Sequence, residues 1–529
     1  MSKKLKVLLV EPDYRRNSAS IIERAADPTH STKKLDDESL WYPPLGLMKL
    51  AKFHNDREDK VDFVYGCKEE SELLGQFKYC DRIYITTLFT FQWKKTVDTI
   101  NYYKNIVSGD STKIFVGGIL ASLLPSKVYE ATGIHPVKGI IQSPKQINLL
   151  GDENIDLLPP DYGIIDSRLY GINDTFYAYN TRGCCNTCAW CGVPKIEPGG
   201  VYYIDIKEII RSLRKSYGEK SKLKLMDNNV LASEELEKIV NDLIELGYGR
   251  NNGKDKKLKK ERIVDFNQGL DARYITEENM QLLSKLNIKP MRIAFDRIEY
   301  KEDYINALTI AKKYGVKSFS NYILYNFKDT PKDFYERLMV NIGLNEEWRD
   351  KSGKPSATIY SYPMRYAPID STISPTKLNP DKGIELSQKG DRNTNITYDN
   401  LCWTRRFIRN VEVMKGTAHG AISPTPSLAK RTIGETLPEF IRNLYMPEEL
   451  LRYRNKYEKG IYEFEPTRMP GNGMVEDFHK FISKLIEARN QRFIAFHNLV
   501  SKNSKESIRK FLLNCVDKEI KKWFKIYLK

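Results

Sequence analysis

The chain has 529 residues, of which 41% are hydrophobic and 29% are charged, a composition typical of a soluble protein with a large core rather than a disordered chain. The apolar run Val7–Val10 is too short for a signal peptide and no later stretch approaches a membrane span, so we expect a cytoplasmic protein with no membrane partner. The net charge of +16 permits nucleic acid as a partner, although lysines spread over solvated helix faces explain it more simply.

The first 150 residues alternate strand-like and helical patterns. Apolar runs predict four strands at residues 4–10, Val61–Tyr65, Arg82–Thr86 and Lys113–Val116. Such alternation predicts a parallel, doubly wound sheet whose ligand crevice lies at the carboxyl ends of the strands. The predicted fold class is therefore α/β, with a Rossmann-like domain at residues 1–150. Paired prolines at Pro159-Pro160 then predict a linker.

Four of the eight cysteines stand in the stretch Thr181–Pro194, TRGCCNTCAWCGVP. Cys184, Cys188 and Cys191 have a C-x3-C-x2-C spacing. Three thiolates on one short loop can reach three corners of a cubane iron–sulfur cluster, whereas a structural zinc site uses four ligands. One iron would then have no protein ligand, so the spacing favours chemistry over scaffolding. Cys185 leaves two alternatives open, namely a C-x2-C-x2-C arrangement and a zinc site built from all four thiols.

This loop, with Trp190 before its third cysteine, resembles the signature of the radical S-adenosylmethionine (SAM) enzymes. The resemblance implies that Cys184, Cys188 and Cys191 hold a [4Fe–4S] cluster whose open iron binds the amino and carboxylate groups of SAM. It also implies that an electron from an external donor, such as flavodoxin or ferredoxin, splits SAM into a 5′-deoxyadenosyl radical that abstracts hydrogen from a substrate. The substrate, the reaction outcome and any catalytic side chain remain unknown at this point.

Six further strand-like runs, each followed by a helical pattern, match the partial (β/α)6 barrel that the resemblance implies for residues 170–370. These runs are Thr175–Asn180, Lys222–Met226, Ile263–Asn267, Met291–Phe295, Ser318–Tyr325 and Thr358–Tyr362. By position, Asp227 and Asn228 after the second strand are candidates to bind the ammonium group of SAM. Gln268, Asp271 and Arg273 after the third strand are candidates for its ribose and carboxylate, with Arg273 gripping the carboxylate. A structural contact between Asp271 and Arg273 is the alternative.

The run Pro43-Pro44-Leu45-Gly46-Leu47, on a doubly wound domain ahead of the cysteine loop, resembles the cobalamin-binding subclass of this family. The resemblance implies cobalamin as a second cofactor and methylation as one reaction outcome. The sequence departs from the pattern of the subclass, because no Asp-x-His-x-x-Gly motif offers a histidine to cobalt. A differently used Rossmann-like domain is therefore an equal alternative.

Residues 371–529 begin with a Pro-, Ser- and Asn-rich stretch, predicted to be a long loop or flap up to about residue 400. Apolar positions at three- and four-residue spacing then predict a basic, helical C-terminal region with helices in Phe478–Val500 and Ile508–Leu528. Taken together, the sequence favours a radical SAM enzyme. The alternative from another class is a zinc- or cluster-stabilised nucleic-acid-binding protein without turnover.

Overall fold

The computed structural model describes residues 4–14, 40–68, 80–250, 258–372, 398–399, 401–418, 420–457 and 473–529. The chain divides into two compact units. The first comprises Met1–Leu270, Glu277–Lys289 and Ala367–Lys377, and the second comprises Asp271–Thr276, Pro290–Tyr366 and Leu378–Lys529. Most of the predicted flap lies outside the described residues. No helix among those described is long and apolar enough to cross a membrane.

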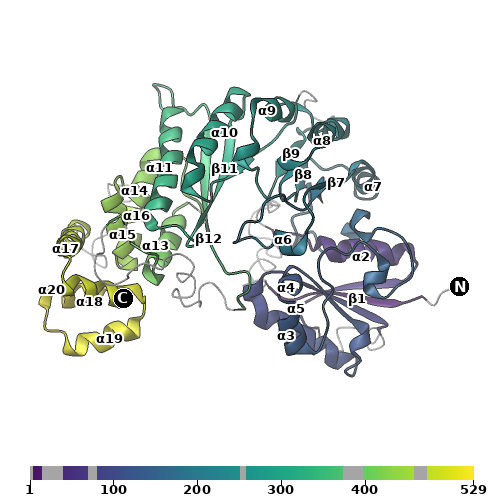
Figure 1. Ribbon diagram of the computed structural model, residues 1–529, viewed down its shortest axis with the longest axis horizontal. Helices are drawn as coiled ribbons and strands as arrows, with labels where there is room; N and C mark the ends of the chain where they lie inside the picture. Colours follow the sequence, from purple (N-terminus) through teal and green to yellow (C-terminus); the bar gives the residue numbers. More distant parts are fainter. Residues whose placement is uncertain are drawn as a thin grey trace, which may run out of the picture. The chain divides into compact units, whose positions relative to one another are not determined.

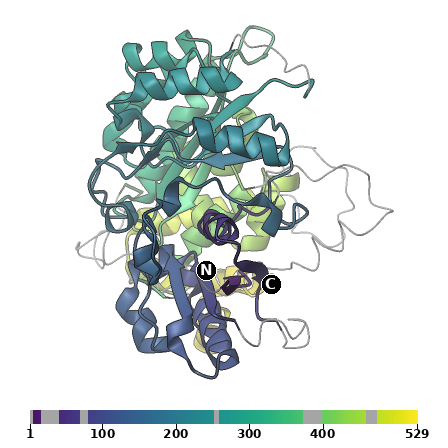
Figure 2. The same cartoon turned by 90° about the vertical axis from the view of Figure 1, so that its right-hand side faces the viewer.

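The four predicted N-terminal strands are confirmed, and they form one parallel sheet in the order β2-β1-β3-β4. In Figure 1 this sheet lies between α2 on one side and α3, α4 and α5 on the other, and Figure 2 shows it from the side on which β1 begins. The elements are β1 (Lys6–Glu11), α2 (Leu45–Asp56), β2 (Lys60–Tyr65), β3 (Arg82–Thr87), α3 (Trp93–Ile106), β4 (Ile114–Gly118), α4 (Ile119–Leu123) and α5 (Pro125–Thr132).

Alternation along β1 explains why helices cover both faces of this sheet. Leu8 and Val10 point to one face, where they pack with Ile100 and Tyr103 of α3 in a buried cluster. Val7 and Leu9 point to the other face and pack with residues of α2, including Leu50. Successive side chains of a strand alternate between faces, so a strand that is apolar throughout needs a covering layer on each side.

The six strands predicted for residues 170–370 are also confirmed, and their ends agree with the prediction within three residues. Three of them form a parallel sheet in the first unit, in the order β5-β8-β9. The elements of this part are β5 (Thr175–Ala178), β6 (Thr181–Arg182), α6 (Val193–Ile196), β7 (Tyr202–Tyr203), α7 (Lys207–Tyr217), β8 (Lys222–Leu225), α8 (Leu236–Leu243), β9 (Ile263–Phe266) and α9 (Glu277–Leu283).

The other three strands form a second parallel sheet, in the order β10-β11-β12, in the second unit. Its elements are β10 (Met291–Ala294), α10 (Lys301–Lys313), β11 (Ser318–Tyr325), α11 (Pro331–Glu347) and β12 (Thr358–Arg365). α11 begins as its sequence favours, because Thr330 is the N-cap and Pro331 is the first helical residue. Thr330 and Asp333 bond each other's backbone amides and so form a capping box.

The regular elements of the described C-terminal region are helices, as predicted. They pack on α11 through a large cluster of buried aromatic and aliphatic side chains. They are α13 (Arg405–Lys415), α14 (Pro426–Ile433), α15 (Leu437–Tyr445), α16 (Glu448–Tyr457), α17 (Met474–Ala488), α18 (Gln491–Ser501), α19 (Lys505–Asn514) and α20 (Lys518–Tyr527).

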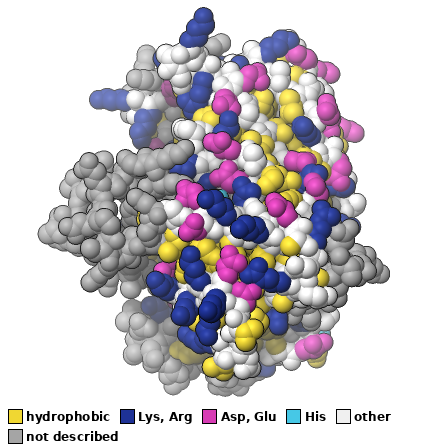
Figure 3. All heavy atoms as spheres, turned by 90° about the vertical axis from the view of Figure 1, so that its left-hand side faces the viewer, with side chains coloured by type: hydrophobic (Ala, Val, Ile, Leu, Met, Phe, Trp, Pro, Cys, Tyr) yellow, Lys and Arg dark blue, Asp and Glu magenta, His cyan; other side chains and the backbone are white. Residues whose placement is uncertain are grey.

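The last helix, α20, lies within the predicted helical stretch Ile508–Leu528 and is amphipathic, since Trp523 and Phe524 are buried while Lys518, Lys521 and Lys525 are exposed. Figure 3 shows Lys and Arg side chains gathered in the lower part of the face on the side of these helices. One face of α20 thus completes the core of the second unit and the other carries solvated lysines, the simpler of the two explanations for the net positive charge. The role of nucleic acid as a partner stays a prediction.

Candidate active site

The cysteine loop follows β5 directly and is closed at its base by a short antiparallel hairpin. Thr181 pairs with Tyr203 and Arg182 with Tyr202, so residues 183–201 leave and return at one place. Cys184, Cys188 and Cys191 are half-buried in this loop, whereas Cys185 is exposed. Parallel strands present their carboxyl ends at one edge of a sheet, which places the loop where an α/β fold carries its reactive groups.

Gly183 allows the loop to close, because no other residue fits its position. Its φ is +78°, in the left-handed region, and a Cβ atom there would lie 1.8 Å from the carbonyl oxygen of Gly200. The residue before the first predicted ligand is therefore fixed against the far end of the loop by direct contact between backbones.

Replacing Gly183 by alanine should destabilise the protein more than replacing Gly199 by alanine. Both glycines have positive φ angles, which cost a side-chain-bearing residue about 1–2 kcal/mol. Nothing lies within 4 Å of a Cβ atom built on Gly199, so that variant lacks the clash. We expect about 2 kcal/mol of additional destabilisation at Gly183, measured by urea unfolding of metal-free protein. Equal losses in the two variants would contradict this explanation of loop closure.

Backbone amides of the loop point at two of the three predicted ligand sulfurs. The amide of Asn186 donates to Sγ of Cys184 and the amide of Val193 to Sγ of Cys191, each at 3.4 Å. Amide donors of this kind stabilise cluster-bound thiolates and tune their clusters. Sγ of Cys185 lies instead 3.7 Å from the side-chain nitrogen of Asn229. Cys184 is half-buried in the loop whereas Cys185 is exposed, which favours Cys184 as the first ligand.

The three thiols are not gathered around one point in the structure. Among the described residues, no group of three or more His, Cys, Asp or Glu side chains is close enough to hold a metal ion. A cysteine side chain turns about a single χ1 torsion, so binding a cluster requires such rotations within the loop. The donor set itself, three thiols on one loop with amide hydrogen bonds to two of them, fits a cluster held by three cysteines.

A group of buried polar side chains lies at the carboxyl ends of β5 and β8. Asn180, Asp227 and Asn229 are at most 3% exposed. Four of their polar atoms have no hydrogen-bond partner, namely both side-chain atoms of Asn180, Oδ2 of Asp227 and Oδ1 of Asn229. Each unpaired buried group costs about 1–3 kcal/mol. Such a concentration is typical of a site that a polar ligand completes, and Asn180 and Asn229 add to the residues predicted from the sequence.

Asp227 has the electrostatic character expected of a site for a cation. Burial raises the pKa of its carboxyl group to about 6, although hydrogen bonds from the hydroxyl and backbone amide of Thr181 oppose this effect. Those two bonds both reach Oδ1, so Oδ2 is the atom left for a ligand. An ammonium group at Oδ2 would stabilise the ionised carboxylate. The residues present therefore fit the predicted contact with the ammonium group of SAM.

The other predicted SAM ligands are either exposed or already paired with another side chain. The side chain of Asn228 donates to Glu197 at 2.9 Å, and Gln268 is exposed. Asp271 and Arg273 belong to the second unit, where they form an ion pair of 2.6 Å. The alternative interpretation of the sequence, a structural contact between Asp271 and Arg273, is thus present. The Arg273 guanidinium also lies 4.9 Å from the ring centroid of Tyr300.

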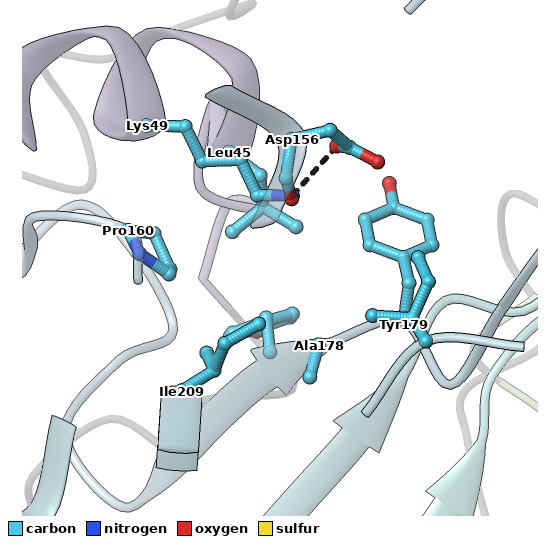
Figure 4. A pocket seen from close by; sticks show the side chains of 9 residues that line it. Leu45, Lys49, Asp156, Pro160, Ala178, Tyr179 and Ile209 are labelled. Carbon is cyan, nitrogen blue, oxygen red and sulfur yellow. Dashed lines mark hydrogen bonds and ion pairs between the residues drawn. The ribbon is translucent and has the colours of Figure 1, made fainter. Parts of the chain in front are cut away.

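Sequence reasoning missed a buried charge network at the base of the cysteine loop. Asp156 lies between two cations, with its Oδ1 atom 2.7 Å from Nζ of Lys49 and 2.5 Å from Nη2 of Arg182. Burial alone would raise the pKa of Asp156, but Lys49 and Arg182 hold it below its ordinary value. Figure 4 shows Lys49 and Asp156 joined beside Tyr179 and a small cavity. The network connects Lys49 of α2 to Arg182, which comes directly before the cysteine loop.

No protein-family model matches the sequence, and a search of curated proteins finds no match. Among solved structures, TsrM from Kitasatospora setae, a radical SAM methyltransferase with tryptophan substrate and a SAM analog bound, aligns with a TM-score of 0.45 and 13% identity over 69% of this chain and 73% of that one. SuiB from Streptococcus suis, bound to its precursor peptide SuiA, aligns with a TM-score of 0.27 and 13% identity over 52% and 55% of the two chains. Neither likeness is close enough to assign a function.

Proposed function

We propose that this protein is a radical SAM enzyme. The observation that carries the proposal is the cysteine loop, which has three thiols at C-x3-C-x2-C spacing and contacts, through Cys185, a buried and incompletely paired polar cluster at the ends of β5 and β8. The three predicted cysteine ligands leave one metal position without a protein ligand. Four polar atoms of the buried cluster have no hydrogen-bond partner. A ligand that bridges an open metal position and a set of polar groups satisfies both.

The chain's own residues have distinct proposed roles. Cys184, Cys188 and Cys191 would hold a [4Fe–4S] cluster, which supplies the electron that splits SAM into methionine and a 5′-deoxyadenosyl radical. Asp227 would accept hydrogen bonds from the SAM ammonium group, with Asn180 and Asn229 beside it. The role predicted for Arg273, binding the SAM carboxylate through its guanidinium, stays a prediction, since Arg273 pairs with Asp271 in the structure. Hydrogen abstraction from a substrate is the reaction class that follows.

The test is a cofactor inventory of protein purified without oxygen. We expect about four iron and four sulfide per chain. We also expect 5′-deoxyadenosine from SAM after reduction by dithionite or by an external donor such as flavodoxin or ferredoxin. Protein that takes up no iron and carries one zinc would contradict the proposal and favour the zinc-stabilised nucleic-acid-binding alternative.

A corrinoid on the first sheet is a second cofactor proposal. Phe89 follows β3, is 45% exposed and stacks on Phe91 with their ring centroids 5.0 Å apart. Ile119, which directly follows β4 and begins α4, is 40% exposed. These exposed apolar side chains follow the carboxyl ends of the strands, where they would contact a bound corrin ring.

We expect the protein to retain hydroxocobalamin through gel filtration, detected by its visible absorption, and Phe89→Ser to weaken this retention. Val516→Ser, which changes an apolar residue that is 95% exposed in the second unit, is the matched control. Wild-type protein that elutes without corrinoid would contradict this second proposal and leave the first one standing.

A further inference from the structure

Glu197 is a largely enclosed carboxylate at the end of the cysteine loop, six positions after Cys191. Its side chain is 11% exposed and accepts three hydrogen bonds. Oε2 accepts from the backbone amide of Gly183 at 2.7 Å and from Nδ2 of Asn228 at 2.9 Å, and Oε1 accepts from Nη1 of Arg182 at 3.1 Å. One side chain thus contacts the hairpin, the start of the loop and the end of β8.

The bond to Gly183 closes the cysteine loop through a side chain. Gly183 immediately precedes the first predicted ligand, and Glu197 follows α6 after the last one. A carboxylate that accepts from a backbone amide makes a stronger hydrogen bond than a neutral acceptor does. The contact is separate from the packing of Gly183 against Gly200, so two independent interactions fix where the loop begins.

The bond to Asn228 connects the loop with the candidate SAM site. Asn228 follows Asp227, which accepts from the backbone amide and hydroxyl of Thr181. Residues 227–228 are therefore held to residues 181–183 from both sides, directly at Thr181 and through Glu197. The spacing between the predicted cluster ligands and Asp227 depends on this arrangement.

The charge of Glu197 is compensated inside the protein. Arg182 bonds Glu197 on one side and Asp156 on the other, and its guanidinium carbon lies 3.5 Å from the ring centroid of Tyr179. Lys49 of α2 pairs with Asp156. Two buried cations thus meet two carboxylates, of which Asp156 is buried and Glu197 is 11% exposed. A network that is neutral and hydrogen-bonded throughout can remain ionised without water, and removing one charge unbalances the rest.

We propose that Glu197 is a positioning residue that holds the cysteine loop at a fixed place relative to the SAM-binding polar cluster. This inference rests on the proposed function. Glu197 is not a catalytic residue, because it touches backbone and side chains of the loop rather than a reacting atom. Its loss should change how well SAM fits more than how fast bound SAM reacts.

The test compares Glu197→Gln with Glu208→Gln, which changes an exposed glutamate of α7 in the same unit that pairs with Arg211. Glutamine keeps the size of the side chain but lacks the negative charge to which the Gly183 amide and Arg182 donate hydrogen bonds. We expect hydrogen exchange of the Gly183 amide to accelerate at least about tenfold in metal-free Glu197→Gln. In cluster-loaded protein we expect KM for SAM to rise about tenfold with kcat within about threefold, since charged hydrogen bonds are being weakened.

Glu208→Gln should behave as wild type in both measurements. Amide exchange and KM within about twofold of wild type in Glu197→Gln would overturn the proposal, as would a fall in kcat at unchanged KM. If Glu197→Gln fails to fold, Asn228→Ala removes one arm of the same arrangement and should raise KM in the same direction. If wild type binds no cluster, the proposed function fails, whereas the exchange measurement on metal-free protein still decides whether Glu197 fixes the loop.

Discussion

Replacing Cys188 by alanine should abolish cluster loading and SAM cleavage together. With only Cys184 and Cys191 left in the C-x3-C-x2-C pattern, two thiolates hold too few corners of a cubane cluster for it to survive purification. Iron and sulfide analysis of oxygen-free protein gives the first readout, and chromatographic detection of 5′-deoxyadenosine gives the second. A variant that keeps both would show that Cys188 is not a ligand.

Cys185→Ala is the matched control for this experiment. Cys185 is exposed, unlike the three predicted ligands, and its sulfur lies 3.7 Å from the side-chain nitrogen of Asn229. We therefore expect its iron content to stay close to that of wild type. A large loss of iron in this variant would favour the C-x2-C-x2-C arrangement, or the zinc site of four thiols, over the assignment made here.

Replacing Asp227 by asparagine should stabilise the protein above pH 6 while weakening its binding of SAM. Asparagine can still accept the two bonds from Thr181 at its oxygen, but it places no charge on the buried atom that has no partner. The loss of a charged hydrogen bond to the SAM ammonium group should weaken binding about 10- to 100-fold. Equilibrium binding of SAM to cluster-loaded protein measures this effect.

The sign of the stability change follows from the pKa of Asp227, which burial raises from 3.8 to about 6. Between these two values the folded protein keeps a proton that the unfolded chain releases, so its stability falls as pH rises towards 6 and levels off above it. At about 1.4 kcal/mol for each pH unit between the two values, the ionised carboxylate costs up to about 3 kcal/mol.

Urea unfolding of metal-free Asp227→Asn should therefore show a gain over wild type at pH 8 that disappears towards pH 4. A cost in stability that a charged ligand offsets is typical of binding sites. A variant that is less stable than wild type at pH 8 and binds SAM equally well would contradict both parts of this explanation.

The strands were predictable from the sequence because each is a short apolar run that ends in polar or turn-forming residues. The run KVLLVE is apolar at positions that face both sides of the sheet, which indicates a strand covered on both faces. The start of α11 was predictable for a similar reason, since Thr330-Pro331 places an N-cap and a first-turn proline together. Local signals of this kind depend on neighbouring residues alone.

The buried network was not predictable because its members are far apart in the sequence and follow no pattern. Lys49, Asp156, Arg182 and Glu197 each read as an ordinary charged residue, and only the fold brings them together. Asn180 belonged to a predicted strand, but nothing indicated that its side chain would be buried without a partner. Conversely, Asp271 and Arg273 are two residues apart and pair with each other, a local contact that competes with the ligand role predicted for Arg273.

The most direct test of the central claim, that three cysteines leave one iron open for SAM, is the electron paramagnetic resonance spectrum of the reduced cluster before and after SAM is added. If an iron is open, SAM should bind to it and change the g-values and line shape, and Asp227→Asn should require more SAM to produce the same change. A spectrum that is identical with and without saturating SAM would contradict the account, because it would mean that every iron already has its full set of protein ligands.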